Sequence, residues 1–586
     1  MWTNGPDTEM MPMYDIAIVG SGIACSRTIC ELAERLKDIP VRGRMLRIAV
    51  IEREGEMWNG VPYGRRSAVG ALAFQRLQEF LEEPERSHYI SWLVADASSW
   101  LKTLREWGGP GAAKWISDNQ SLMDGDKWGE LYLPRFLFGL YVSSQAARAV
   151  EELSRTGLAS VTPINGEVTG VSRRPDRFHN IAVEGYSGAR FSVHAARIVL
   201  AIGSPPQKSI FSGAVAGQHS HTHIEDIYSP SEGISIQKIH QALIALPKQM
   251  ANILILGSNA SSLEVLYLIN YRPEIRNLIN SVVVLSRSGL LPYKICEETV
   301  QFELTALESL RECSYFTAAN LMAAITCDIR RAEELRLNIA DLRDPVGAAV
   351  SRLTALLPTS EQKKFVCEHG VHYSRMMRRA GRDTRSAADE LANLGILNTV
   401  KGDLRTLEPI QSGNGLMSAT YTTAGCEGEI TYPVPFSITI NCGGFEELEV
   451  SSSPLINSLI ENKLCCVNST KRGFVVNDRL EASENVYVIG PLVGGNFNGK
   501  IRYWHVESAS RIVGLAKLLA ESLSDSLFPP SEYPVSNASG LGERMASSGE
   551  LAAPSPPADL VRVLRPDISE CRVESLYADD LLEELP

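Results

Sequence analysis

The feature that most constrains the fold of this chain is a short apolar run that leads directly into a glycine-rich turn. Tyr14 to Val19 is rich in β-branched residues, as buried strands are, and Gly20-Ser21-Gly22 follows at once. From Ile29 to Leu36 the apolar spacing becomes helical, and Arg47 to Glu52 has the pattern of a second strand. The segment therefore predicts a strand-helix-strand unit of a parallel α/β sheet.

This turn suits a nucleotide pyrophosphate, because a helix N-terminus offers unpaired N–H groups and a favourable dipole. Gly20 permits a tight turn, and Gly22 removes a side chain that would strike the phosphates. Cys25 replaces the third glycine of the usual fingerprint, but it is small enough for helix and strand to pack. Glu52 ends the second strand, where it can accept the adenosine ribose hydroxyls. The predicted contacts are Gly20, Ser21, Gly22, Ile23 and Glu52.

A second unit repeats this plan between residues 251 and 285, with Asn259 where the second glycine is expected. Its second strand continues into Leu285-Ser286-Arg287-Ser288, which has no acidic residue to hold a ribose diol. An arginine beside two hydroxyls suits a 2′-phosphate instead, so we predict NADPH rather than NADH. A domain with only a packing role is the alternative. The predicted contacts are Gly257, Ser258, Asn259, Ser261, Ser262 and Arg287.

A third strand-turn-helix segment, from Asn485 through Gly490 to about Leu523, would complete the first sheet. We therefore predict an α/β fold with two Rossmann-like dinucleotide-binding domains, the second inserted in the first, a helical insertion and a flexible C-terminal tail. The expected boundaries are 13–245 and 426–525 for the two parts of the FAD-binding domain and 246–425 for the NADPH-binding domain. The helical insertion is expected at about 296–397, where strand signals fade, and the tail at 526–586.

Composition excludes several classes of function. The formal net charge of -12 argues against nucleic-acid binding, and no apolar run is long enough for a membrane span. The N-terminus lacks the pattern of a secretory signal, and an odd number of cysteines, 11, fits reduced thiols. Cys25 and Cys30 form a C-x4-C pair inside the first helix, which favours packing over redox chemistry. We expect a cytoplasmic protein that acts on small molecules, with no metal site.

Four further segments carry a family resemblance. They are Gly60-Val61-Pro62-Tyr63-Gly64, Leu131-Tyr132-Leu133-Pro134-Arg135, Ile198 to Pro206 with Gly203, and Gly490-Pro491-Leu492 with Trp504-His505-Val506-Glu507. With the two glycine turns, they resemble the two-dinucleotide-binding-domain flavoproteins, particularly the flavin monooxygenases that include N-hydroxylating enzymes. The resemblance implies that FAD contacts Tyr63, Arg135, Gly203, Gly490, Pro491 and Leu492.

The stretch from Phe211 through Gly213 to His219 loosely resembles the interdomain fingerprint of NADPH-dependent flavin monooxygenases. Within that group the chain is most similar to nitrosuccinate-forming L-aspartate N-monooxygenases. The resemblance implies that NADPH reduces FAD and that the reduced flavin captures O2 as a C4a-hydroperoxyflavin. The amino group of a small amino acid such as L-aspartate would then be hydroxylated.

An amino-acid substrate needs cations for its carboxylates. Arg502 and His505 lie beside the predicted flavin cap and, with Asn496, are the predicted catalytic residues, while Asn498 is a second candidate contact of the flavin ring. Other candidate cations are Arg135, Lys500 and the run Arg375, Arg378, Arg379, Arg382 and Arg385. A solvated basic face is the commoner explanation for such a run.

Other functions remain open at this point. The same scaffold carries Baeyer-Villiger and sulfur monooxygenases and NADPH-flavin reductases. The irregular second turn and acidic C-terminus also fit a non-catalytic flavin-binding regulatory protein. A homo-oligomer is compatible with the sequence.

Overall fold

The computed structural model describes residues 13–38, 44–210, 221–296, 300–410, 415–426 and 428–529. Met1–Phe528 form one compact unit, and Pro529–Pro586 form a second unit of which only Pro529 is described. The tail predicted at 526–586 therefore lies almost wholly outside the described residues. Among the described residues, no helix has both the length and the apolar composition needed to cross a lipid bilayer.

The first sheet has the strand order β17-β18-β6-β1-β2-β3, and β5 and β4 extend it from β6. The five strands from β18 to β3 are parallel, whereas β17, β4 and β5 pair antiparallel. Six of the seven residues of β1 are buried, as expected for a strand covered on both faces. The strands are β1 (Met13–Val19), β2 (Leu46–Glu52), β3 (Ala159–Asn165), β4 (Glu167–Arg173), β5 (His179–Glu184), β6 (Arg190–Leu200), β17 (Glu481–Ser483) and β18 (Val486–Val488).

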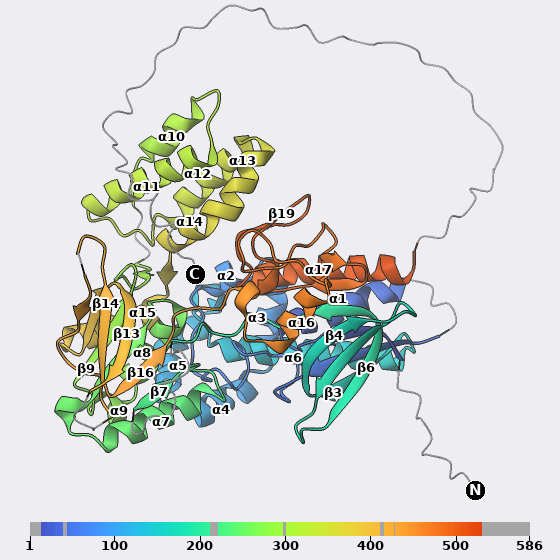
Figure 1. The fold of residues 1–586 in the computed structure, drawn as a ribbon, viewed down its shortest axis with the longest axis horizontal. Helices are drawn as coiled ribbons and strands as arrows, with labels where there is room; N and C mark the ends of the chain where they lie inside the picture. Colours follow the sequence, from blue (N-terminus) through green and yellow to red (C-terminus); the bar gives the residue numbers. More distant parts are fainter. Residues whose placement is uncertain are drawn as a thin grey trace, which may run out of the picture. The chain divides into compact units, whose positions relative to one another are not determined.

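Three long helices pack together beside this sheet. They are α1 (Ile23–Asp38), α6 (Arg135–Arg155) and α17 (Ala509–Leu527). The apolar face of α1 contacts both α6 and α17, and Figure 1 shows α1 and α17 side by side although they come from opposite ends of the chain. Ile29, Leu32 and Leu36 of α1 are fully buried, so the helical spacing seen in the sequence corresponds to its buried face. The predicted strand-helix-strand unit is confirmed.

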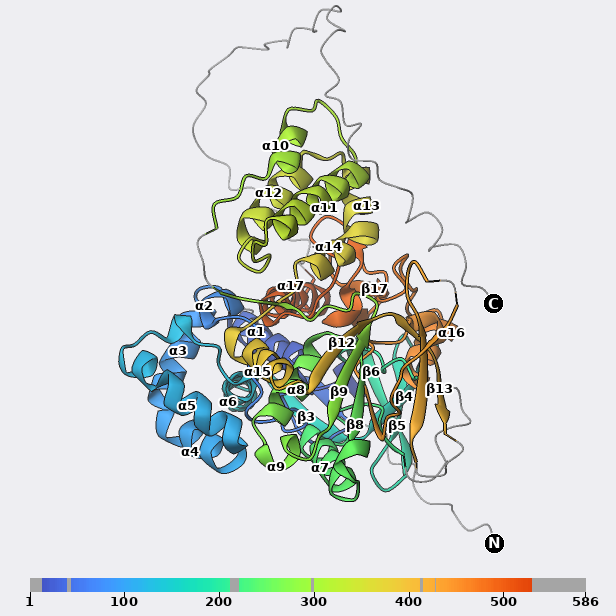
Figure 2. The same ribbon diagram turned by 90° about the vertical axis from the view of Figure 1, so that its left-hand side faces the viewer.

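A run of helices between β2 and α6 was not predicted. It comprises α2 (Leu77–Phe80), α3 (Glu85–Ala95), α4 (Ala97–Trp107), α5 (Gly109–Asp124) and the 3₁₀ turn η1 (Trp128–Glu130). Tyr89 and Trp100 are each only 1% exposed and anchor this run in the core. Figure 2 shows α3, α4 and α5 near α6, whose first residue, Arg135, these helices lead to.

The second sheet is entirely parallel and has the order β12-β9-β8-β16-β7. Its strands are β7 (Thr222–Ile224), β8 (Asn252–Leu256), β9 (Ser281–Ser286), β12 (Leu397–Lys401) and β16 (Ile438–Asn441). They all lie between β6 and β17 in the sequence, so the predicted insertion of the second domain in the first is confirmed. The helices of this part are α7 (Glu232–Ile244), η2 (Lys248–Met250), α8 (Ala260–Asn270), α9 (Pro273–Arg276) and α15 (Arg382–Asn393). Helices α8 and α15 are packed on each other (Figure 2).

Strand pairing departs from the predicted boundaries at two points. β7 precedes residue 246 and β16 follows residue 425, yet both pair in the second sheet. These strands have only three and four residues, too few for a periodic pattern to reveal them. An antiparallel layer, β13 (Asp403–Pro409), β14 (Met417–Thr422) and β15 (Ile430–Thr431), lies between β12 and β16 in the chain. The assignment of each sheet to a particular nucleotide stays a prediction.

The predicted helical insertion consists of α10 (Thr305–Arg311), α11 (Ala318–Glu334), α12 (Arg343–Leu356), α13 (Thr359–Lys364), the π-helical turn η3 (Phe365–His369) and α14 (Gly370–Met376). It has its own apolar core around Leu321, Val346 and Phe365. Within the expected insertion, α11 ends at Glu334 and a turn follows, in which Arg336 has a positive φ of 58°. The strands β10 (Tyr293–Lys294) and β11 (Arg379–Ala380) pair at its base.

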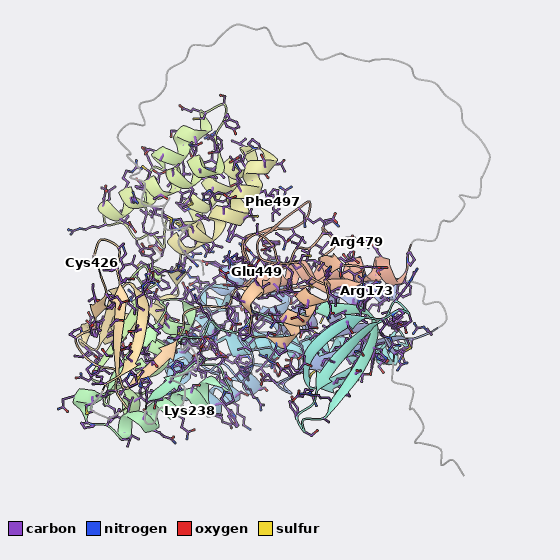
Figure 3. The ribbon with its side chains drawn as sticks, in the orientation of Figure 1. Arg173, Lys238, Cys426, Glu449, Arg479 and Phe497 are labelled. Atoms are coloured by element: carbon purple, nitrogen blue, oxygen red, sulfur yellow. The ribbon has the colours of Figure 1, made fainter. Side chains whose placement is uncertain are left out.

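The chain returns from the second sheet through η4 (Leu448–Val450) and α16 (Pro454–Glu461) to the first sheet. After β18 come the turn η5 (Pro491–Val493) and the two-residue strands β19 (Asn496–Phe497) and β20 (Arg502–Tyr503). Strand β19 contacts η3 of the helical insertion, and Figure 3 labels Phe497 on this hairpin. The hairpin thereby connects the end of the first sheet to the insertion.

Candidate functional site

The two glycine turns have the same local geometry. Gly20 follows β1 with a φ of 89°, and Gly257 follows β8 with a φ of 93°. Each donates its N–H to a carbonyl of the next strand at 2.8 Å, Gly20 to Ile51 and Gly257 to Leu285. The sequence repeat is therefore a structural repeat, including at the second turn, where the usual glycine pattern is incomplete.

A side chain is excluded at both turns by backbone atoms. A Cβ added to Gly20 would lie 2.6 Å from the Ala201 carbonyl oxygen, and one added to Gly257 would lie 2.2 Å from that of Cys442. Both oxygens belong to residues just beyond a neighbouring parallel strand. Glycine is required at these two positions by the positive φ and by the close approach of the neighbouring chain.

Glu52 lies at the end of β2 with its carboxylate turned toward the first glycine turn. One carboxylate oxygen accepts from the N–H and the hydroxyl of Ser21, each at 2.8 Å. The other oxygen accepts from the N–H of Glu54 at 2.9 Å, and the residue is 8% exposed. Ser21 thus orients Glu52 beside the turn, which is the position predicted for a ribose-binding carboxylate. Its contact with ribose stays a prediction.

The Gly60-to-Gly64 loop packs directly on the first glycine turn. A Cβ added to Gly60 would lie 3.1 Å from the Cα of Gly22, so the two backbones are in close contact. The Tyr63 ring lies 5.5 Å from the Phe138 ring, edge to face, and burial raises the pKa of Tyr63 to about 12. A Cβ on Gly139 would lie 2.0 Å from the Tyr63 carbonyl oxygen. The loop is thus held between the turn and α6.

Gly203 and Gly490 follow β6 and β18, which are neighbours of β1 in the sheet. Because these strands are parallel, the two glycines lie at the same edge as the first turn. Their φ values are 79° and 90°; a Cβ on Gly203 would meet no atom within 4 Å, and one on Gly490 only the Ala24 Cβ at 4.0 Å. Pro491 begins η5, and Leu492 is 1% exposed. These residues and Ile23, the first residue of α1, follow the first sheet beside the turn, and the open space at Gly203 and Gly490 fits the close approach of FAD.

Arg135 forms a buried ion pair with Glu264, and its predicted contact with the cofactor stays a prediction. Its guanidinium donates to the carboxylate of Glu264 in α8 and, at 2.8 Å, to the hydroxyl of Ser67. Burial opposes the charge of Arg135, but the attraction of Glu264 outweighs it and the pKa is raised. Arg135 therefore connects the start of α6 to a helix of the second sheet. The motif around it is equally consistent with domain contact and with cofactor binding, which sequence alone does not separate.

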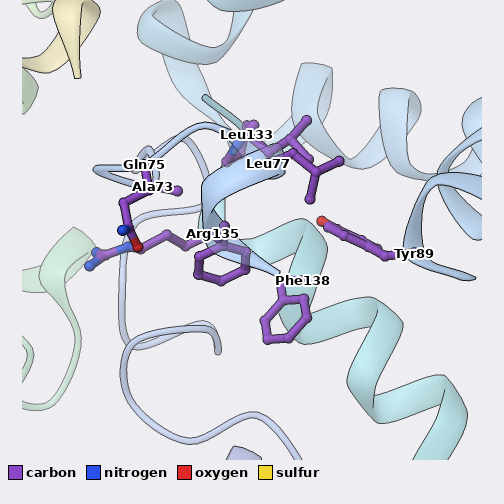
Figure 4. Close-up of a pocket in the computed structure, with 9 residues that line it drawn as sticks. Ala73, Gln75, Leu77, Tyr89, Leu133, Arg135 and Phe138 are labelled. Carbon is purple, nitrogen blue, oxygen red and sulfur yellow. The ribbon is translucent and has the colours of Figure 1, made fainter. Parts of the chain in front are cut away.

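A small cavity lies next to Arg135 (Figure 4). Its volume is about 10 Å³, and Leu77, Tyr89, Leu133 and Phe138 are among the residues that line it. The Tyr89 hydroxyl and the Arg135 Nε are buried without a hydrogen-bond partner. The space suits a single water that bonds these polar atoms, and it is far too small for a cofactor.

At the second turn, Ser258 and Ser262 are buried, whereas Asn259 is exposed at the N-terminus of α8. The Ser262 hydroxyl donates to the Asn259 carbonyl at 2.7 Å, while the Asn259 side chain makes no capping bond. Ser261 is half-buried beside Tyr228. The Asn259 side chain is therefore not fixed by the helix and can turn away from a pyrophosphate, so the site fits a second dinucleotide.

Arg287 directly follows β9, at the same sheet edge as the second turn. Its guanidinium lies 3.9 Å from the carboxylate of Asp403. The two side chains are 70% and 57% exposed, so this pair contributes little to stability and leaves the guanidinium available. Its contact with a 2′-phosphate stays a prediction.

Asn496 is used entirely by the backbone, which disagrees with its predicted catalytic role. Its amide nitrogen donates to the carbonyls of Phe474 at 2.7 Å and Val493 at 2.9 Å, and its oxygen accepts from Val476 at 3.1 Å. Both amide hydrogens are thus occupied, so Asn496 stabilises the loop. Asn498 does the same, since it donates to the Val476 carbonyl at 3.0 Å and accepts from the N–H of Ile501.

Arg502 and Lys500 lie on the exposed side of the β19–β20 hairpin. The Arg502 guanidinium contacts Gln362 of α13 at 3.4 Å and lies over the Phe497 ring. Lys500 is 53% exposed and 4.0 Å from Glu521. The structure therefore gives Arg502 a contact with the helical insertion, and it gives neither residue a contact with the glycine turns.

His505 joins the helical insertion to α17. Arg511 donates to the His505 carbonyl at 2.7 Å and approaches Nδ1 at 3.5 Å. Nδ1 is therefore the acceptor, and Nε2 donates to the Ser374 hydroxyl of α14 at 3.1 Å. Burial, followed by Arg511 and two other arginines, lowers the pKa of His505 to about 4, so the ring is neutral near pH 7. Both nitrogens are engaged, which favours a positioning role over proton transfer.

The predicted arginine run separates in the structure. Arg379 pairs with Glu79 at 2.8 Å, Arg385 pairs with Asp389, and Arg382 begins α15. By contrast, Arg375 of α14 lies within electrostatic range of Arg378, just after this helix, and of Arg472. A purely solvated basic face is therefore the wrong description of this run.

We call Arg375, Arg378, Arg472 and Arg511 the arginine cluster. The last three act electrostatically on Glu507, and Arg375 lies within electrostatic range of Arg378 and Arg472. Burial, then Arg287, Arg378 and Arg472, lower the pKa of Arg375 to about 10. Among the described residues, no carboxylate lies within 4.0 Å of the guanidinium groups of Arg375, Arg378 and Arg472. The side chains of Arg375 and Arg472 are accessible to solvent. Guanidinium groups that are near one another and unpaired favour an anionic ligand.

The cluster is assembled by close backbone contacts. A Cβ added to Gly370 of α14 would lie 2.6 Å from Trp504, and one added to Gly473, next to Arg472, would lie 2.2 Å from the Gly494 carbonyl oxygen. Tyr293, shortly after Arg287, donates its N–H to the Arg378 carbonyl at 3.0 Å. Segments from both sheets and the insertion therefore converge here.

Sequence reasoning missed three members of this site. Arg472 and Arg511 were not singled out, and Glu507 was quoted only as part of a motif. Arg472 lies in a loop without periodicity, between Lys471 and Gly473. The nearest available signal was the short spacing of His505, Glu507 and Arg511 around the start of the last predicted helix. The interdomain stretch Phe211 to His219 lies outside the described residues.

Comparisons with known proteins place these features in context. A family model described as FAD-NAD(P)-binding matches residues 17–205. The "Uncharacterized protein Rv3403c" of Mycobacterium tuberculosis and the "Uncharacterized protein Mb3437c" of Mycobacterium bovis are each 43% identical over 519 residues, which cover 88% of this chain and 96% of theirs.

Two solved structures are similar at lower identity. An ornithine N-hydroxylase from Kutzneria sp. 744 has 14% identity and a TM-score of 0.47, with 88% of this chain and all of that chain covered. The cadaverine monooxygenase DfoA from Erwinia amylovora has 13% identity and a TM-score of 0.49, with 92% of this chain and all of that chain covered.

Proposed function

The chain belongs to the same family as its mycobacterial relatives, and its residues 17–205 match an FAD-NAD(P)-binding family model; on this premise we propose that it is a FAD- and NADPH-dependent monooxygenase. Its substrate is a small acidic amino acid such as L-aspartate, which it hydroxylates on the amino nitrogen. The observation that carries the proposal is the convergence, around one set of unpaired arginines, of segments from both sheets. The choice of nitrogen follows from the resemblance of the sequence motifs to those of N-hydroxylating flavoproteins.

FAD binds at the edge of the first sheet. Gly20, Gly203 and Gly490 allow its close approach, and Glu52, oriented by Ser21, accepts the ribose hydroxyls. Reduced by NADPH, bound FAD supplies the activation of dioxygen. The Gly60 loop and the segment after β18 close over the turn and limit the access of water.

NADPH binds at the edge of the second sheet. The N-terminus of α8 receives the pyrophosphate, and Arg287 holds the 2′-phosphate. Because Arg287 is close enough to lower the pKa of Arg375, the nicotinamide cofactor extends toward the arginine cluster from the second sheet.

The substrate carboxylates bind to the arginine cluster. Arg378, Arg472 and Arg511 are within electrostatic range of one another through Glu507, and guanidinium groups bind carboxylates through paired hydrogen bonds. His505, held by Ser374 and Arg511, keeps α14 against the start of α17. The insertion and the first sheet therefore form one substrate site.

Product analysis tests this function. We expect purified holoprotein to consume NADPH faster when L-aspartate is added, and mass spectrometry to detect an N-oxygenated product that carries one label from ¹⁸O₂. NADPH consumption that makes hydrogen peroxide and no oxygenated product with any amine would contradict the monooxygenase and favour a flavin reductase. A product from another amino acid would change the substrate alone.

Arg287 gives a separate prediction about cofactor choice. Arg287→Ala removes the cation at the 2′-phosphate, so we expect kcat/KM for NADPH to fall roughly tenfold to a hundredfold, as for the loss of a charged hydrogen bond. In the same variant, kcat/KM for NADH should change little. Steady-state kinetics with both cofactors measures the ratio.

Arg405→Ala is the matched control, because Arg405 is an exposed arginine on β13 close to Asp403. This substitution should leave kcat/KM unchanged for both NADPH and NADH. An equal loss for NADPH and NADH in Arg287→Ala would mean that Arg287 does not read the 2′-phosphate.

A further inference from the structure

Glu507 is a carboxylate within electrostatic range of three members of the arginine cluster, and it lies two residues after His505, which Arg511 and Ser374 contact. Three charges, those of Arg472, Arg378 and Arg511, act on it. Among the described residues, no basic nitrogen lies within 4.0 Å of its carboxylate. The side chain still reaches solvent, but it stands among densely packed segments that partly desolvate the carboxylate. The attraction therefore acts without a direct ion pair.

The backbone at Glu507 is held on both sides. Ser508 follows as the N-cap of α17, while His505 contacts Ser374 at 3.1 Å and receives a bond from Arg511. A Cβ added to Gly494 would lie 3.2 Å from the Cα of His505, so the preceding loop is tightly packed. A carboxylate on such a support has a defined position relative to the arginines.

An acidic amino acid presents two carboxylates and one ammonium group. The arginines attract the carboxylates but repel the ammonium group, so an all-arginine site would bind a dicarboxylate better than an amino acid. A single carboxylate among the arginines attracts the ammonium group and so favours the amino acid over the dicarboxylate. Oxidation at nitrogen also requires a free electron pair, so the ammonium group must first lose a proton.

We propose that Glu507 binds the ammonium group of the substrate and accepts the proton that this nitrogen loses before it is oxidised. The transfer converts an ammonium ion and a carboxylate into a neutral amine and a carboxylic acid, so charge and protons balance. This inference rests on the acidic amino-acid substrate proposed above. Burial raises the pKa of Glu507, while the three arginines lower it, and the net shift is upward, which makes it a stronger proton acceptor than an ordinary carboxylate.

Binding of L-aspartate and of succinate tests the inference without any turnover. Succinate has the same two carboxylates and lacks the amine. Isothermal titration calorimetry on the oxidised holoprotein without NADPH gives a dissociation constant for each ligand. In Glu507→Gln we expect L-aspartate to bind at least tenfold more weakly, and succinate to bind equally well or more tightly because a repulsive charge is gone. Succinate binding also shows that the variant is folded.

Two further variants complete the design. Glu507→Asp retains the charge and should keep a preference for L-aspartate over succinate. Glu449→Gln removes an exposed carboxylate that lies 3.5 Å from Lys471, the neighbour of Arg472, and should leave both constants unchanged (Figure 3).

Each other outcome has a distinct meaning. If Glu507→Gln changes the affinity for both ligands by the same factor, in either direction, Glu507 only balances the arginines and the inference is overturned. If the wild-type protein binds L-aspartate no better than succinate, Glu507 does not select the amine. If it binds neither ligand, the acidic substrate itself is wrong, and the inference is overturned with it.

Discussion

Gly20→Ala is expected to destabilise the protein by about 2 to 5 kcal/mol and to abolish retention of FAD. The φ of 89° strains any residue with a side chain, and the new Cβ would lie 2.6 Å from the Ala201 carbonyl oxygen. That oxygen belongs to the backbone beyond β6 and cannot move without disturbing the sheet. Relief of the clash would shift the turn that receives the pyrophosphate. Denaturant unfolding and the visible absorbance of the purified protein measure the two effects.

Alanine substitutions at two other glycines distinguish the cost of backbone strain from the cost of a steric clash. Gly203 has a φ of 79°, but a Cβ there meets no atom within 4 Å, so Gly203→Ala should cost only the strain, about 1 kcal/mol. Gly514 lies within α17 with free space around it, and Gly514→Ala should not destabilise. If Gly20→Ala were as stable as Gly514→Ala and remained yellow, the first turn would not be the flavin site.

Arg135→Met should be destabilising by about 3 to 5 kcal/mol, because it leaves buried carboxylates without a cation. Glu264, which is 3% exposed, loses its ion pair, and Glu232, which is 0% exposed, loses a nearby positive charge. Methionine keeps much of the apolar length of the arginine, so lost packing contributes little. Chemical denaturation of the holoprotein measures the change in the free energy of unfolding.

The loss in Arg135→Met should grow with pH. Burial and the neighbouring Glu264 raise the pKa of Glu232 in the folded protein, and removal of Arg135 raises it further. A carboxyl group with a raised folded pKa contributes stability below its unfolded pKa, and that contribution is lost as pH rises through the folded pKa. The difference between variant and wild type should therefore be larger at about pH 8 than at about pH 5.5.

Arg148→Met is the matched control, since Arg148 is an exposed arginine on the same helix. It should change the free energy of unfolding by no more than about 0.5 kcal/mol at either pH. A loss in Arg135→Met that is small, or independent of pH, would show that the pair with Glu264 does not hold the two sheets together.

Much of the fold was predictable because its signals are local. Parallel strands that are buried on both faces, such as β1, β8 and β9, are continuous apolar runs in the sequence. Gly20 and Gly257 mark the turns that follow β1 and β8. Those strands and the inserted second domain were predicted correctly. The short strands β7 and β16 and the helices from α2 to α5 were missed, since their pairing and packing depend on segments distant in sequence.

The candidate site was predictable only in part. Glu52 lies beside the turn as expected, because the end of β2 is fixed by the sheet. The sequence did not reveal the partners of Asn496 and Arg135, because a polar residue near a glycine turn is the same residue type whether it contacts a ligand, a backbone carbonyl or a distant carboxylate. Which partner it meets depends on packing.

The sequence by itself determined the two nucleotide-type turns and the order of the domains, because strand periodicity and the backbone freedom of glycine act over a few residues. Only the tertiary structure decided which charges act together. Arg287, Arg375, Arg472 and Glu507 are far apart in the chain and come within electrostatic range because the insertion packs against the segment before α17. Charge interactions depend on distance in space, and sequence spacing does not encode that distance.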